Sequence, residues 1–201
     1  MKLPFGLLAI TPAVHPKLPD AVRQVVHAAG SQVAILLRDK ALTPEGLRCW
    51  AEQLLPICRA AGSLLLVHAN PEVAHTVAAD GVHLPERISP AAARATLGAA
   101  ALIGISRHYP AHLREGAGAD YATLSPIFAT PGKGKPLGLP VLAEACRTAA
   151  LPVIALGGIT PERAAECREA GAIAVAAIRA VWHRDAGLNA LRLLGQAAAS
   201  A

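Results

Sequence analysis

The stretch that decides the fold runs from residue 152 to residue 162 and reads Pro-Val-Ile-Ala-Leu-Gly-Gly-Ile-Thr-Pro-Glu. Its first five residues form a continuous apolar run, which is typical of a strand that is covered on both faces. Gly157 and Gly158 then predict a tight turn, and Thr160 before Pro161 predicts the capped first turn of a helix. A buried strand that leads directly into a helix is the unit of a βα repeat.

The same unit recurs along the chain. Short apolar runs bounded by turn residues occupy residues 5–10, 32–37, 63–67, 81–84, 101–105, 119–124, 152–156 and 172–176. Segments with helical spacing lie between them, at residues 20–29, 44–60, 71–79, 90–97, 139–149 and 161–170. Thr43, Ser89 and Thr160 each precede a proline, which predicts three N-terminal caps.

Eight strands with intervening helices predict an α/β protein, a (β/α)8 TIM barrel that forms a single domain over residues 1–201. The competing fold is an open, doubly wound sheet. No Gly-x-Gly-x-x-Gly motif follows the first apolar run, and this disfavours the open sheet. No linker-like change of composition divides the chain.

The composition excludes several classes of protein. The chain has 201 residues, of which 53% are hydrophobic and 3% aromatic, so it is neither disordered nor rich in stacking platforms for single-stranded nucleic acid. Its net charge of +5 is dispersed, so we expect no nucleic-acid partner. A mild positive charge suits small anionic substrates, although ordinary solubility is the favoured explanation.

Cysteine usage and hydropathy indicate a location. Cys49, Cys58, Cys146 and Cys167 form no Cys-x-x-Cys pair and are predicted to be reduced, mostly buried thiols on helices. No apolar run is long enough for a membrane helix, and the N-terminal run ends at a Thr-Pro turn without a signal-peptide cleavage pattern. We therefore expect a cytoplasmic protein with no membrane partner.

The barrel prediction places the chemistry where the strands end, at their carboxyl edge. After the seventh run, Gly157 and Gly158 lead into a capped helix, whose N-terminus favours an anion. Ile178 and Arg179 follow the eighth run, so we expect a phosphate site there. A tight turn without a ligand is the alternative interpretation. Lys133 lies in a glycine-rich loop that either closes over a phosphate or is simply solvated.

Two cations follow the second run. Alternation along a strand sends Arg38 and Lys40 to the same side, where they would hold a phosphate or pyrophosphate. Asp39 lies between them in the sequence and would neutralise one of them in the alternative interpretation.

Three histidines, His68, His83 and His108, end consecutive runs. A zinc site is disfavoured because Glu86 is the only acidic residue near them, so we predict no metal ligands. His108 is the candidate acid or base, because the ordinary pKa of imidazole suits proton transfer near neutral pH. The other histidines are predicted to lie in loops or on helix surfaces and receive no role: His15, His27, His75, His112 and His183.

Seven motifs of this chain occur in the same order in a known family. They lie at residues 35–40, 80–84, 103–108, 118–121, 125–133, 152–159 and 170–172. The longest, residues 125–133, reads Ser-Pro-Ile-Phe-Ala-Thr-Pro-Gly-Lys. With these motifs the chain resembles the thiamine-phosphate synthase/TenI family. The resemblance implies a (β/α)8 barrel, often a homodimer, that acts on a thiazole phosphate in thiamine biosynthesis.

The resemblance also implies roles for single residues. The synthase joins hydroxymethylpyrimidine pyrophosphate to a thiazole phosphate and releases pyrophosphate with the help of Mg²⁺. By position, Arg38, Lys40 and Lys133 would hold the pyrophosphate. The residues expected around the thiazole phosphate are Ser106, Thr130, Gly158, Ile178 and Arg179. With Gly157 and His83 these residues form the predicted substrate-binding set.

The chain departs from the synthase pattern at the metal. The two positions at which the family's synthases carry magnesium-binding aspartates are Ala69 and Ile88 here. Leu36 replaces a glutamine that would face the pyrimidine. These departures favour the TenI-like branch, whose tautomerase moves a proton and needs no cofactor.

Three functions therefore stay open. The first is metal-independent proton transfer on a small phosphorylated heterocycle. The TenI tautomerase carries its histidine at the position of Pro126, so His108 or His68 would have to act as the catalytic group. The second is a divergent thiamine-phosphate synthase, which would need Mg²⁺. The third is a non-catalytic sensor that kept the phosphate site.

Overall fold

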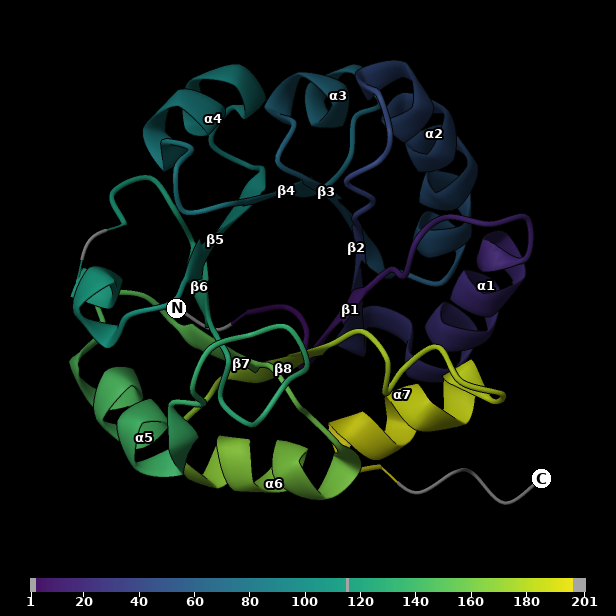
Figure 1. Cartoon of the computed structure of the whole chain (residues 1–201). Helices are drawn as coiled ribbons and strands as arrows, with labels where there is room; N and C mark the ends of the chain where they lie inside the picture. The colour runs from purple at the N-terminus through teal and green to yellow at the C-terminus, as the bar shows by residue number, and fades with distance from the viewer. Residues whose placement is uncertain (1–2, 115, 197–201) are drawn as a thin grey trace.

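Eight parallel strands close into a barrel, which confirms the predicted (β/α)8 fold (Figure 1). The structure is a computed structural model and describes residues 3–114 and 116–196. The strands follow one another around the barrel in sequence order: β1 (Leu7–Ile10), β2 (Val33–Leu37), β3 (Leu64–His68), β4 (Gly81–Leu84), β5 (Leu102–Arg107), β6 (Tyr121–Leu124), β7 (Val153–Leu156) and β8 (Ala174–Ala177). Pairing of β1 with β8 completes the ring.

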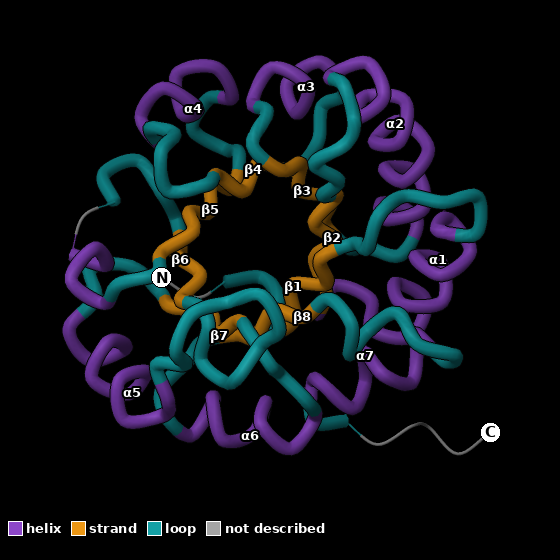
Figure 2. Tube along the Cα trace, in the orientation of Figure 1, coloured by secondary structure: helices purple, strands orange, loops and turns teal. Residues whose placement is uncertain are grey.

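Helices surround the strands as an outer layer (Figure 2). They are α1 (Leu18–Ala29), α2 (Pro44–Ala60), α3 (Pro71–Thr76), α4 (Pro90–Leu97), α5 (Gly138–Thr148), α6 (Pro161–Glu169) and α7 (Ala186–Leu194), with short 3-10 segments η1 (Gly30–Gln32) and η2 (Pro110–Arg114). Thr43 and Thr160 cap α2 and α6 as predicted, because their hydroxyls accept from the N–H of Gly46 and Arg163.

Every strand except β4 contributes to two separate cores, which explains most of the continuous apolar runs, whereas the inward positions of β4 are Gly81 and His83. In β1, Leu7 and Ala9 pack against the helices, while Leu8 and Ile10 point into the barrel. Both faces of a strand are therefore shielded from water, and the alternation of apolar and polar residues that marks a half-exposed strand is absent.

Side chains fill the amino end of the barrel. Leu3 and Phe5 precede β1 and join the inner core, where the Phe5 ring lies edge-on to Tyr121 with the centroids 6.0 Å apart. Toward the carboxyl end, Ile10 and Leu36 form the top of this inner core and the floor of a cavity.

Several local predictions need correction. Between β5 and β6, where no helical segment was predicted, the described residues form the 3-10 segment η2, and α7 is a helix that the sequence did not predict. The hydroxyl of Ser89 makes no capping hydrogen bond to α4. All four cysteines lie in helices as predicted, but Cys49 is exposed on α2. Among the described residues no helix combines the length and the apolar character that crossing a bilayer requires.

Candidate active site

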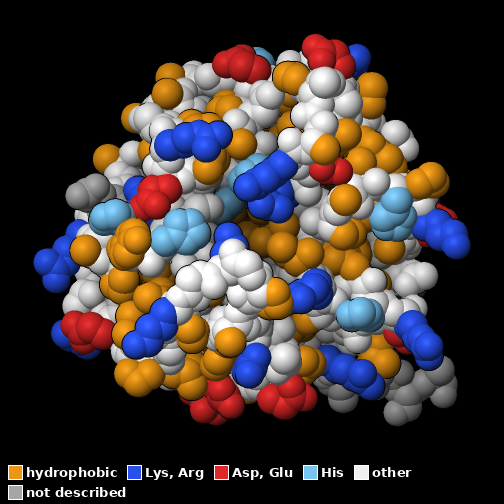
Figure 3. Space-filling model, in the orientation of Figure 1, with side chains coloured by type: hydrophobic (Ala, Val, Ile, Leu, Met, Phe, Trp, Pro, Cys, Tyr) orange, Lys and Arg blue, Asp and Glu red, His pale blue; other side chains and the backbone are white. Residues whose placement is uncertain are grey.

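The carboxyl ends of the strands surround a cavity of about 290 Å³. Every site residue predicted from the sequence lines it: Arg38, Lys40, His68, His83, Ser106, His108, Thr130, Lys133, Gly157, Gly158, Ile178 and Arg179. Figure 3 looks into the hollow from the carboxyl end and shows lysine and arginine side chains around a hydrophobic floor. The floor residues Ile10, Leu36 and Leu156 are apolar, which suits the face of an aromatic heterocycle.

Four cations reach the cavity, and we call Arg38, Lys40, Lys133 and Arg179 the rim cations. Thr11, which directly follows β1, fixes the backbone of Arg38, because its buried hydroxyl accepts from the N–H of Arg38 at 2.9 Å. The side chains of Arg38 and Lys40 therefore both extend into the cavity from the segment that follows β2.

Asp39 does not neutralise these cations. Its carboxylate accepts the N–H of Ala41 at 2.9 Å and the N–H of Val14 at 3.0 Å. These backbone hydrogen bonds hold the pKa of Asp39 below its usual range, with a smaller contribution from the charge of Arg38. Within residues 3–114 and 116–196, Asp39 forms no ion pair with Arg38 or Lys40, so the alternative interpretation of this segment is wrong.

The turn after β7 is held open toward the cavity. Phe128 N–H donates to the carbonyl of Gly157 at 3.0 Å, and the Arg163 guanidinium donates to the carbonyl of Gly158 at 2.8 Å. Both glycines have positive φ, and a Cβ on Gly158 would lie 2.8 Å from Cβ of Phe128. In the described part of the chain, the N–H groups of the two glycines meet no protein acceptor, so they are available to an anion.

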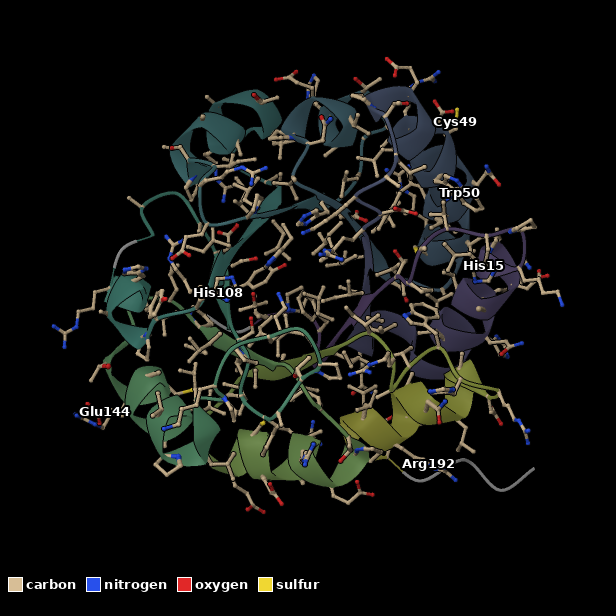
Figure 4. All side chains as sticks on the ribbon, in the orientation of Figure 1. His15, Cys49, Trp50, His108, Glu144 and Arg192 are labelled. Carbon is tan, nitrogen blue, oxygen red and sulfur yellow. The ribbon has the colours of Figure 1, made fainter. Side chains whose placement is uncertain are left out.

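His108 is placed as an acceptor. Figure 4 labels it beside β6, inside the ring of helices on which Cys49, Glu144 and Arg192 lie. Its Nδ1 lies 3.0 Å from the backbone carbonyl of Ser125 and 3.4 Å from the hydroxyl of the same residue. A carbonyl only accepts, so Nδ1 carries a hydrogen. In the described part of the chain, Nε2 of His108 has no protein partner. Sequence reasoning did not find the contribution of Ser125, because it depends on how β5 and β6 end side by side.

The other two histidines are neutral at pH 7. Burial, together with the charges of Arg38 and Lys40, lowers the pKa of His68 to about 4. Burial lowers the pKa of His83 to about 3. Both nitrogens of His83 already have protein partners, Tyr121 and Ser106, so it is not a free metal ligand.

These lowered pKa values make the stability of the protein depend on pH. The unfolded chain takes up protons on His68 and His83 near pH 6.5, whereas the folded chain takes them up only near pH 4 and pH 3. Their contribution to stability is therefore complete above pH 6.5 and is lost as the pH falls. When the pH is lowered from 7 to 5, we expect the unfolding free energy to fall by about 2 kcal/mol because of the buried His83. Urea denaturation at the two pH values measures this change.

The variant His83→Gln should flatten this dependence, whereas His27→Gln, on the exposed side of α1, should leave it unchanged. Equal slopes for the wild-type protein and His83→Gln would contradict the assignment.

The chain matches the family model described as thiamine monophosphate synthase over residues 7–181. The chain belongs to this family. A protein named thiamine-phosphate synthase from Roseiflexus castenholzii is 41% identical over 165 residues, which are 78% of this chain and 72% of the relative. One from Bordetella pertussis is 37% identical over 197 residues, covering 90% of this chain and 89% of the relative.

The solved structure titled thiamine phosphate pyrophosphorylase from Pyrococcus furiosus superposes on this chain with a TM-score of 0.84. It is 26% identical and covers 95% of this chain and 94% of its own. The resemblance drawn from the seven motifs is therefore confirmed. The expected preference for the TenI-like branch is not supported by these relatives, which bear the name of the synthase or of the pyrophosphorylase.

The thiamine monophosphate synthase family implies Mg²⁺, and the donors in this cavity do not fit that ion. Ala69 and Ile88 offer no side-chain oxygen, and Glu86 is the only carboxylate among the cavity-lining residues. Its oxygen lies 2.6 Å from Nδ1 of His112, a residue to which sequence reasoning assigned no role. Among the described residues no three His, Cys, Asp or Glu side chains are grouped as a metal site would require.

Proposed function

We propose that this chain is a divergent thiamine-phosphate synthase that joins hydroxymethylpyrimidine pyrophosphate to a thiazole phosphate and releases pyrophosphate. The observation that carries the proposal is the set of rim cations around one cavity whose only carboxylate is already engaged by His112. Two phosphorylated substrates bring more negative charge than one, and the excess of rim cations over carboxylates in the cavity suits that charge. The names and identities of the relatives support the same function.

The proposed reaction divides the cavity between two anions. Arg38, Lys40 and Lys133 bind the pyrophosphate, while the N–H groups of Gly157 and Gly158 and the side chain of Arg179 bind the thiazole phosphate. The carbon–oxygen bond to pyrophosphate breaks, and the same carbon forms a bond to the thiazole ring. Charge develops on the departing pyrophosphate, so cations fixed beside it stabilise the transition state more than the bound substrate.

We further propose that the chain's own cations neutralise the pyrophosphate without a magnesium ion held by carboxylates. We expect inorganic pyrophosphate to bind in the presence of EDTA, with an affinity that Mg²⁺ changes by less than about tenfold, as measured by calorimetry. The variant Arg38→Gln should weaken this binding, whereas Arg192→Gln, on the outer helix α7, should not. Binding that vanishes in EDTA would contradict the proposal.

The condensation itself is tested by incubating the chain with both substrates and quantifying thiamine phosphate and pyrophosphate by chromatography. Equal amounts of the two products, and neither product when one substrate is omitted, are the expected result. No condensation with or without Mg²⁺, despite binding of both substrates, would refute the synthase function.

Proton transfer on a thiazole phosphate is a second candidate, favoured by Nε2 of His108, which lines the cavity and has no protein partner among the described residues. If it occurs, thiazole phosphate alone should exchange hydrogen for deuterium in D₂O, observed by proton NMR. His108→Ala should slow this exchange by about 100-fold, whereas His27→Ala, which removes an exposed histidine of α1 outside the cavity, should not. Absence of exchange in the wild-type protein would eliminate this candidate.

A further inference from the structure

A chain of three buried or half-buried polar side chains crosses the barrel from β6 to the cavity. The Tyr121 hydroxyl lies 3.1 Å from Nδ1 of His83, and Nε2 of His83 lies 3.0 Å from the hydroxyl of Ser106. Tyr121 is 0% exposed and His83 is 3% exposed, whereas Ser106 reaches the cavity. Ionisable polar groups at this depth need a reason, because an apolar core would be simpler to build.

The first hydrogen bond has one direction. In the described part of the chain, His83 Nδ1 is the only partner of the Tyr121 hydroxyl. If Nδ1 were the donor, the hydroxyl hydrogen of Tyr121 would be buried without an acceptor, which is costly. Tyr121 also stays protonated, because burial raises its pKa. The tyrosine therefore donates and Nδ1 accepts.

The second direction follows from the first. His83 is neutral because burial lowers its pKa to about 3, so a ring that accepts at Nδ1 carries its hydrogen at Nε2. This hydrogen points at the Ser106 hydroxyl oxygen at 3.0 Å, while the Thr123 hydroxyl is more distant at 3.5 Å. With its oxygen occupied as an acceptor, Ser106 has its own hydrogen left to donate into the cavity.

We propose that Tyr121 and His83 are positioning residues that fix the Ser106 hydroxyl as a hydrogen-bond donor to the substrate. The substrate atom that meets Ser106 is then an acceptor, such as a phosphate oxygen or an unprotonated ring nitrogen, and not an N–H group. This inference rests on the proposed function only in that the acceptor belongs to one of its two substrates.

The strand between these residues is built to let them meet. Gly104 of β5 is the register partner of His83 on one side and of Tyr121 on the other. A Cβ at this position would lie 2.1 Å from Cζ of Tyr121 and 2.5 Å from Nδ1 of His83. A glycine in the middle of a strand weakens the strand, and here its absent side chain is the space in which the hydrogen bond forms.

Nitrogen-15 NMR of the full chain tests the direction directly, because the two tautomers of a neutral histidine have different ring nitrogen shifts. We expect His83 to be protonated at Nε2 in the wild-type protein and to lose this fixed tautomer in Tyr121→Phe. Phe5→Leu is the matched control, because Phe5 packs on Tyr121 without bonding to His83, and it should keep the tautomer. A wild-type His83 protonated at Nδ1 would overturn the proposal.

Kinetics provides the second measurement. His83→Gln keeps one donor and one acceptor, whereas His83→Leu removes both. We expect His83→Leu and Ser106→Ala each to lower kcat/KM for condensation by about tenfold, with little further loss in the double variant, and His83→Gln to recover most of the activity. Additive losses, or equal activity of His83→Gln and His83→Leu, would contradict the positioning role. If no condensation occurs at all, the tautomer measurement still decides this inference independently of the proposed function.

Discussion

Arg38→Ala should lower kcat/KM for condensation by about 100- to 1,000-fold, because it removes a fixed charge from the departing pyrophosphate. The Thr11 hydroxyl holds the backbone of Arg38, and Asp39 turns its carboxylate to backbone N–H groups instead of to the guanidinium. The arginine is therefore both positioned and uncompensated. We expect most of the loss in kcat, since the charge on pyrophosphate is greatest as the carbon–oxygen bond breaks.

Two variants give this experiment its controls. Arg38→Lys keeps the charge but loses the two-pronged geometry, so its loss should be intermediate. Arg192→Ala removes an arginine of α7 that lies outside the cavity and should change nothing. A change of less than about threefold in Arg38→Ala would mean that the pyrophosphate lies elsewhere.

Gly81→Ala should lower the unfolding free energy by about 3 kcal/mol or more, or prevent folding. Gly81 opens β4, and a Cβ there would lie 1.9 Å from the backbone oxygen of Leu102 in β5. The clash is with backbone on the neighbouring strand, so a rotamer change cannot relieve it. Relief requires opening the ladder between β4 and β5, which belongs to a closed ring and has no free edge into which it can move.

Urea denaturation followed by circular dichroism measures this effect, with Gly134→Ala as the control. A Cβ on Gly134 meets nothing within 4 Å, so this variant should be as stable as the wild-type protein. A Gly81→Ala protein with wild-type stability would show that the barrel accommodates the added methyl group.

The fold could be read from the sequence because its signals are local. Apolar runs, proline-marked helix starts and the double glycine each act within a few residues, and the barrel follows from their repetition. The helix α7 was missed because Gly187 and Asn189 weaken its helical signal. The structure explains that glycine, since a Cβ on Gly187 would lie 2.9 Å from the carbonyl of Gln24 in α1. Close packing of two helices is not visible in the sequence of either one.

The site was predictable in position but not in its hydrogen bonds. Residues that end the strands must gather at one face, so many of the cavity-lining residues could be named from the sequence alone, although Ser125 was not among them. The pairing of Tyr121 with His83, and of Ser125 with His108, depends on the register of neighbouring strands. The hydrogen bonds of Asp39 were equally unpredictable. The fold of the loop determines that its carboxylate binds two backbone N–H groups and not the adjacent cations.

The filled amino end of the barrel has a kinetic consequence. The barrel is closed below the cavity floor by the side chains of Leu3, Phe5 and Tyr121. Molecules therefore enter and leave the site through the same opening, at the carboxyl end. In the proposed reaction, pyrophosphate released inside must pass the loop that carries Lys133 before a fresh substrate can take its place. Pyrophosphate in the cavity opening then competes with binding of the next substrate, and accumulated pyrophosphate inhibits turnover.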